Sequence, residues 1–265
     1  MTSDLYLNLF PKNNYPNSSN HTKMAVLIFF VLHWYLSLFV QTFFLHRYAA
    51  HNMFTMSKTS ERFFYIFTFI CQGSSYLSPR AYGIMHRMHH VHADTEHDPH
   101  SPKYDKSIVA MMMRTFKIFK DIFRKNVKIE PQYEKGVPDW SAFDKMASSG
   151  FARIFWITFY VAFYYFFATH WLMYLLIPIH IGMGPVHGVI VNWFAHKFGY
   201  SNFEMENTSV NLMPWDIFMM GEGLHNNHHR NATRANFGYK QYEFDPTYPI
   251  ILLLDKLNII QLRKY

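Results

Sequence analysis

Apolar residues in this chain gather in long runs, and two of these runs are long enough to cross a membrane. Residues 24–46 contain no Asp, Glu, Lys or Arg, and neither do the 43 residues of 154–196. A bilayer core about 30 Å thick needs about 20 helical residues at a rise of about 1.5 Å each. The first run therefore predicts one membrane-spanning helix, and the second predicts a hairpin of two helices that turns near residues 169–171.

This pattern predicts an all-α integral membrane protein with about three transmembrane helices, at about 24–46, 154–169 and 172–196. Residues 1–23 are polar and rich in Asn and Ser, which predicts a loose N-terminal tail ahead of a single membrane domain at 24–265. Whether the further uncharged stretch at 63–79 spans the membrane is ambiguous, because it has only 17 residues and its second half is polar and turn-forming.

Lysine and arginine predict the orientation of these spans. Residues 46–150 carry 15 of them and residues 197–265 carry 7, whereas residues 1–23 carry 2 and the turn near 170 carries none. By the positive-inside rule, both long polar regions face the cytoplasm and the N-terminus lies outside. The basic, amphipathic stretch at 108–125 suits a helix that lies on the membrane surface.

Composition supports a membrane protein and excludes several other classes. Half of the 265 residues are hydrophobic and 19% are aromatic, which excludes a disordered chain. Only 16% are charged, and this is too few for a soluble domain of this size. A single cysteine, Cys71, excludes a disulfide framework. The net charge of +7 is explained by the membrane surface, and no common nucleic-acid-binding motif is found, so we expect no nucleic-acid partner.

Seventeen histidines are present, and many of them form three short motifs: HRYAAH at 46–51, HRMHH at 86–90 and HNNHH at 225–229. On a helix, the three histidines of the second motif share one face, and so do those of the third, because positions i, i+3 and i+4 are neighbours. His46 and His51 are five residues apart, about 140° around an α-helix, so they can reach one ion only from different heights or with a local bend.

One more pair, Asn192 and His196, lies one helical turn apart at the cytoplasmic end of the last predicted span and could join the same cluster. This makes nine imidazoles, more than one tetrahedral or octahedral ion needs, so we expect a di-metal site in a cytoplasmic helical cap. Imidazole suits iron, zinc and copper. The lack of cysteine thiolates argues against structural zinc and iron–sulfur clusters.

The other histidines are expected to have different roles. Four of them are isolated in apolar segments, where we expect them to pack or to form hydrogen bonds: His33, His170, His180 and His187. Residues 91–100 (VHADTEHDPH) contain three more. There we expect the carboxylates to orient neighbouring imidazoles rather than to bind metal themselves: Asp94, Glu96 and Asp98.

Topology adds a constraint. If all the motifs serve one centre, the chain must cross the membrane an even number of times between any two of them. The stretch at 63–79 therefore cannot be a lone full span, whereas the hairpin at 154–196 supplies the two crossings required between the second and third motifs. The centre is then expected at the cytoplasmic face, where the spans end in His46 and His196.

At this point the motifs can be compared with a known family. HRYAAH, HRMHH followed by DTEHDPHSP, NWFAH and GEGLHNNHH resemble the membrane fatty acid desaturases, especially the branch that acts on acyl-CoA and acyl-lipids, over residues 24–260. The resemblance implies a non-haem di-iron centre held by nine histidines, with a water held by an asparagine. Matched position by position, these residues are His46, His51, His86, His89, His90, His196, His225, His228 and His229, with Asn192 holding the water.

The resemblance further suggests how the ligands divide and what the centre does. We assign one iron to His46, His51, His86, His90 and His228, and the other to His89, His196, His225 and His229. No catalytic residue is expected beyond these ligands. The implied reaction is O₂-dependent introduction of a cis double bond into a saturated acyl chain, carried by CoA or a lipid. Electrons would come from a separate ferredoxin-like or cytochrome b5-like carrier and its reductase.

Two other functions remain open at this stage. Membrane hydroxylases and ketolases of alkyl or isoprenoid lipids use similar histidine motifs, and a fold does not determine the product. A metal transporter could also use histidines. However, the clustering at the cytoplasmic ends and the absence of charged residues inside the spans disfavour a pathway through the membrane.

Overall fold

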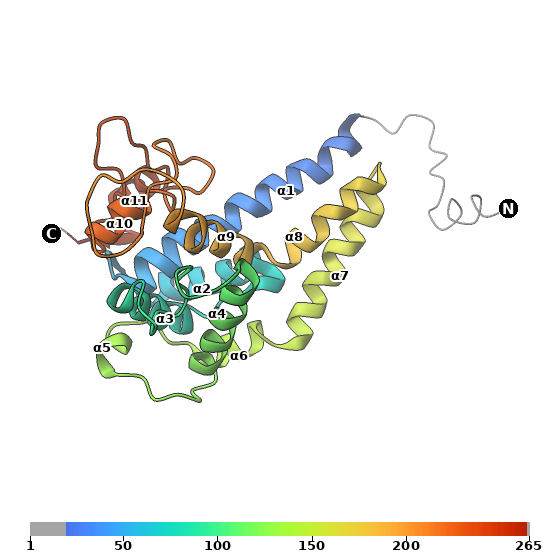
Figure 1. Cartoon of the computed structure of the whole chain (residues 1–265). Coiled ribbons are helices and arrows are strands. Elements are labelled where there is room, and N and C mark those ends of the chain that lie inside the picture. Colours follow the sequence, from blue (N-terminus) through green and yellow to red (C-terminus); the bar gives the residue numbers. More distant parts are fainter. Residues whose placement is uncertain (1–19, 264–265) are drawn as a thin grey trace.

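Helices make up nearly all the regular structure in a computed structural model of the protein, which describes residues 20–263. Figure 1 shows α1 (Asn20–Val40), α7 (Gly150–Phe167) and α8 (Ile177–Ile181) projecting together from a more compact group of helices. This arrangement confirms the helical membrane fold predicted from the sequence. The expected tail at 1–23 lies largely outside the described residues.

Two helices have the length and composition to span a membrane. The first covers Met24–Ala50, where α1 continues without a break into the π-helix η1 (Gln41–Ala50), and the second is α7. Their apolar side chains point outward: Leu27, Ile28 and Val31 are each about half exposed, and Phe151 on α7 is 83% exposed. Such faces suit contact with lipid tails, because in water they would form an unusually large apolar patch.

The third apolar stretch is bent rather than straight. Trp171–Ile181 and Met183–His196 meet at an angle of 72°, and only together do they have the character of one span. The first part comprises the 3₁₀-helix η3 (Trp171–Leu176) and α8, and the second comprises α9 (Met183–Asn192) and η4 (Phe194–His196). Gly182 lies at the bend, where its low helix propensity allows the break.

The bend frees backbone groups that must find partners in an apolar environment. Ser74 donates to the carbonyl of Ile181 (3.0 Å), and the hydroxyl of Ser75 accepts from the amide of Gly184 (3.1 Å). Both serines belong to the 3₁₀-helix η2 (Gly73–Ser75), so this short segment supports the bent span. Its first residue must be glycine, since φ is +55° and a Cβ would lie 1.8 Å from the Tyr160 hydroxyl oxygen.

The remaining helices form a cap at one end of the spans. They are α2 (Lys58–Gln72), α3 (Pro79–His92), α4 (Ile108–Phe123), α5 (Pro131–Glu134), α6 (Ser141–Ala147), α10 (His225–Arg230) and α11 (Thr247–Lys256). The ambiguous stretch at 63–79 forms the end of α2 and η2, and it is not among the apolar helices long enough to span a membrane in the described chain. Serine side chains cap the first turns of four helices, each accepting a backbone N–H: Ser57, Ser78, Ser107 and Ser149.

A small sheet joins the two ends of the cap. Strand β1 (Phe54–Met56) pairs antiparallel with β2 (Ile260–Leu262), with Thr55 opposite Gln261. The main apolar core lies beside it and is formed by residues from η1, α2 and the C-terminal part of the chain, including Phe43, Phe54 and Phe237. The segment that follows the first histidine motif is thereby attached to the end of the chain.

Buried charges hold this core together around Arg47, whose side chain is fully buried. Its guanidinium group lies 2.7 Å from Asp245 and 3.5 Å from Glu222, donates to the Ala235 carbonyl, and stacks 3.8 Å from the centre of the Phe237 ring. Burial raises the pKa of Asp245, and Arg47 opposes that shift. One cation thus neutralises two carboxylates that have little access to water.

Replacing Arg47 by methionine should destabilise the fold strongly. Removing one partner of a buried ion pair typically costs about 3–5 kcal/mol, because the other charge stays buried and unpaired. We expect a clear fall in the unfolding temperature of the detergent-purified protein. Arg62→Met is the control, since Arg62 is exposed and stacks on Trp140 at 4.2 Å. Similar unfolding temperatures for both variants would contradict this account.

The spans also predict which parts of the chain lie on opposite sides of a membrane. Thr169 follows α7 at one end of the bundle, whereas Ala142 lies in the cap at the other end, and both are exposed. Cysteines placed at these two positions should react with a membrane-impermeant maleimide from opposite sides of sealed vesicles. Labelling of both from the same side would show that α7 does not cross.

Candidate metal centre

The first histidine motif lies on the π-helix η1, which solves the spacing problem raised by the sequence. In this helix the backbone N–H of residue i+5 bonds to the carbonyl of residue i, and His51 donates in this way to His46 (3.1 Å). Residues five apart then point the same way, and the two rings lie 5.0 Å apart. The sequence left two possibilities, different heights or a local bend, and the local change of helix type takes the place of both.

The other two motifs lie on α3 and α10, and each helix contributes to two groups of imidazoles. On α3, His86 and His90 join the first group, while His89 joins the second. On α10 the division is reversed: His228 joins the first group, while His225 and His229 join the second. η4 adds His196 to the second group.

The two groups contain the nine histidines singled out in the sequence. In each group the ligand nitrogens lie within 4.8 Å of one another: His46, His51, His86, His90 and His228 in the first cluster, and His89, His196, His225 and His229 in the second cluster. Several Nε2 pairs are closer. The Nε2–Nε2 distance is 2.9 Å between His46 and His228, 3.0 Å between His196 and His225, and 3.3 Å between His89 and His229.

Carboxylates orient individual rings from behind. His46 donates through Nδ1 to Glu222 (2.6 Å), which is also bonded by Thr42. His89 donates through Nδ1 to Asp98 (2.9 Å). A ring whose Nδ1 carries the proton presents the lone pair of Nε2 on its other side, so both Nε2 atoms face their cluster as acceptors.

His196 is oriented through a hydroxyl. Its Nδ1 lies 3.2 Å from Thr208, which donates in turn to Asp94 (2.8 Å). The orienting contacts predicted from the sequence are thus present for Asp98 and, through Thr208, for Asp94. Glu96 differs, because its side chain is 78% exposed and its nearest histidine is His97, which is also exposed.

Electrostatics keeps the clusters in a form that can bind metal. Burial, and then the neighbouring imidazoles, lower the pKa of His86, His225 and His228 well below the usual range, so these rings are neutral. Burial alone would raise the pKa of Asp98, but the hydrogen bond from His89 holds it well below its ordinary value. Neutral imidazoles beside ionised carboxylates are the protonation states that metal binding requires.

Sequence reasoning missed several residues of this site. Glu222 holds His46 and is itself bonded by Thr42, and Thr208 holds His196, yet none of the three was expected to have a role. For Glu222 a signal was available, because it stands three residues before His225 in GEGLHNNHH. The partners of Thr42 and Thr208 are distant in sequence, so no local pattern could identify them.

The four isolated histidines of the apolar segments lie outside the two clusters, as expected. His33 and His180 contact each other (2.5 Å) within the membrane segments, and His180 also bonds the Tyr164 hydroxyl (2.9 Å). The His187 ring packs edge-on against Trp34, with 4.6 Å between the ring centroids. None of the three belongs to a potential metal cluster in the described chain, and the same is true of His170.

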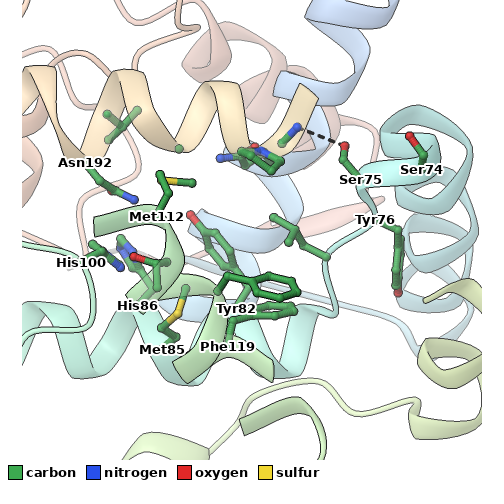
Figure 2. A pocket seen from close by; sticks show the side chains of 18 of the residues that line it. Ser74, Ser75, Tyr76, Tyr82, Met85, His86, His100, Met112, Phe119 and Asn192 are labelled. Carbon is green, nitrogen blue, oxygen red and sulfur yellow. Dashed lines mark hydrogen bonds between the residues drawn. The ribbon is translucent and has the colours of Figure 1, made fainter. Parts of the chain in front are cut away.

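A cavity of about 440 Å³ leads away from the clusters. Figure 2 shows His86, His100 and Asn192 at one end and Ser74, Ser75 and Tyr76 at the other. Between these ends the wall is mainly apolar, with side chains from α3, α4, α7 and α9: Tyr82, Met85, Met112, Phe116, Phe119, Ile157 and Val191. Asn192 therefore lies on the cavity wall beside the clusters. Such a slot suits an extended apolar ligand.

Comparisons with known proteins agree with this geometry. The chain matches the family described as fatty acid desaturase over residues 22–251. It is 27% identical over 253 residues to the sn-1 stearoyl-lipid 9-desaturase of Anabaena variabilis, covering 91% of this chain and 84% of the relative. It is 30% identical over 249 residues to the Delta-9 desaturase-like 5 protein of Arabidopsis thaliana, covering 91% and 77%.

A third relative has a different described activity. The hex-5-enoyl-[acyl-carrier protein] acetylenase of Moorena producens is 27% identical over 256 residues, covering 86% of this chain and 73% of the relative. The family match extends over most of the chain and includes all nine clustered histidines. This protein belongs to the fatty acid desaturase family.

Proposed function

We propose that the protein introduces a cis double bond into a saturated fatty acyl chain, carried by CoA or by a lipid, in a reaction that consumes O₂. The observation that supports this best is the cavity, which is mainly apolar and at one end is lined by His86 of the first cluster. A saturated chain lying in it would pass its methylene groups close to the imidazoles. The reaction also agrees with the family and with the stearoyl-lipid desaturases among the relatives.

The clusters fit metal ions on geometric grounds. Two nitrogens that bind one ion at about 2.1 Å from neighbouring octahedral positions lie about 3 Å apart. The closest Nε2 pairs are separated by 2.9 Å between His90 and His228, and by 3.0 Å between His225 and His229. His46 and His89 donate through Nδ1 to carboxylates, which leaves the Nε2 lone pair of each ring free to bind an ion.

We therefore propose two iron ions, one in each cluster. The first would be held by His46, His51, His86, His90 and His228, and the second by His89, His196, His225 and His229, with a water held by Asn192. Iron at these positions would supply an oxidant made from O₂, which removal of hydrogen from an unactivated methylene requires.

The protein's own residues orient the metal ligands, bind the acyl chain and exclude water. Glu222 and Asp98 keep the rings of His46 and His89 in fixed tautomers, so the ligands need no reorganisation. Apolar side chains such as Met85 and Phe119 hold the acyl chain and keep water away, which limits side reactions of a strong oxidant. We propose no catalytic residue beyond the ligands.

The proposed reaction also has implications for the membrane placement of the protein and for its electron donor. We propose that residues 24–265 form one multi-pass membrane domain whose active site faces the cytoplasm, because the cap carries most of the lysine and arginine. Electrons would come from a separate ferredoxin-like or cytochrome b5-like carrier with its reductase. Exposed cations on the cap, including Lys125 and Lys145, would favour the approach of an acidic carrier.

Loss of one imidazole should remove metal and activity together. We expect His89→Ala and His225→Ala to lower the iron content of the purified protein and to reduce desaturation at least about 100-fold, since changes to outer partners of metal ligands alone cost about 10–100-fold. His97→Ala is the matched control, because this ring is 73% exposed and lies in the loop after α3. Full activity of His225→Ala, or zinc as the only metal in active protein, would disprove the assignment.

The product identifies the reaction. Cells that express the protein and receive perdeuterated stearate or palmitate should form a monounsaturated acid that lacks two deuterium atoms, detected by gas chromatography and mass spectrometry. Cells that express His225→Ala should not form it. A product that stays saturated and gains one oxygen atom would instead identify a hydroxylase.

A further inference from the structure

His100 is a tenth imidazole beside the clusters. It lies within 4.8 Å of His89 and Asp98 as a third group of potential metal ligands, but those two side chains are already hydrogen-bonded to each other. Its side chain is only 2% exposed, and neither ring nitrogen has a hydrogen-bond partner within residues 20–263. A buried polar group without a partner is unfavourable, and in native proteins such groups are usually satisfied by water or by a ligand. The ring nitrogens are therefore available to something bound in the cavity.

The position of the ring limits what that partner can be. His100 lines the cavity, 4.2 Å from the ring of His89 and 6.4 Å from the ring of His86, measured between centroids. Figure 2 shows it at the same end of the cavity as Asn192, which comes from the opposite wall on α9. A saturated acyl chain offers no hydrogen-bond acceptor here, so the partner is a small polar molecule.

The loop that carries His100 is held firmly from several sides. The backbone N–H of His100 donates to Asp98 (3.0 Å), the carboxylate that also orients His89. Thr115 on α4 donates to the carbonyl of Pro99 (3.1 Å), and Ser101 donates to Asp94 (2.6 Å). The imidazole is thus positioned before any ligand arrives, which is how donors at binding and catalytic sites work best.

We propose that His100 and Asn192 form a binding site for a small polar hydrogen-bond acceptor, such as water or azide, on the cavity side of the second cluster. The proposal rests on the metal centre described above. His100 donates its ring N–H to the bound molecule from one wall, and Asn192 contacts it from the other. His100 does not bind the metal itself and acts as a second contact for a ligand of that metal.

The test measures azide binding to the oxidised, iron-containing protein through the charge-transfer absorbance that azide produces on ferric iron. His100→Phe and His100→Leu remove the donor, and His100→Gln restores an N–H at a similar reach. We expect all three variants to keep the iron content of the unmodified protein. The azide Kd should rise about tenfold or more in the Phe and Leu variants, because a hydrogen bond to a charged ligand is lost, and much less in the Gln variant.

His97→Leu is the matched control, since His97 lies in the same loop but is 73% exposed, and it should bind azide normally. Unchanged azide affinity in both His100→Phe and His100→Leu would overturn the proposal. So would loss of iron in all His100 variants, which would make His100 a metal ligand. In either case the unmodified protein would still hold iron and bind azide. Absence of iron from the unmodified protein would instead overturn the metal centre, and this site with it.

Discussion

Nine imidazoles meet in two clusters, and the rest of the cap is arranged around that meeting. Each ring has a second nitrogen that has to be fixed, and at the best-defined positions this is done by a carboxylate, as with Glu222 behind His46. That carboxylate is buried and therefore needs a cation nearby. Arg47 supplies it and also pairs with Asp245. The core and the candidate metal centre thus share one group of charges.

Much of this could be predicted from the sequence because the signals are local. A run of 23 uncharged residues has few alternatives to a membrane helix, and HRMHH places three imidazoles on one side of any helix that contains it. Asp98 stands nine residues after His89 in a short loop, so a contact between them was a reasonable expectation.

The features that could not be predicted depend on contacts between distant parts of the chain. Nothing in HRYAAH indicates a π-helix, whose weaker backbone geometry is retained because both rings must reach the same cluster. The bend at Gly182 depends on Ser74 and Ser75, which lie more than 100 residues earlier. The partner of Arg47 at Asp245 is 198 residues away. Local periodicity carries no information about such pairings.

The reversed division of histidines between α3 and α10 has a consequence for how the family can vary. One helix gives positions i and i+4 to the first cluster and i+3 to the second, and the other helix does the opposite. The separation of the two clusters is therefore determined by the pitch of two helices that face each other. Connecting loops can lengthen, shorten or diverge without altering that separation, provided that the two helices stay in register.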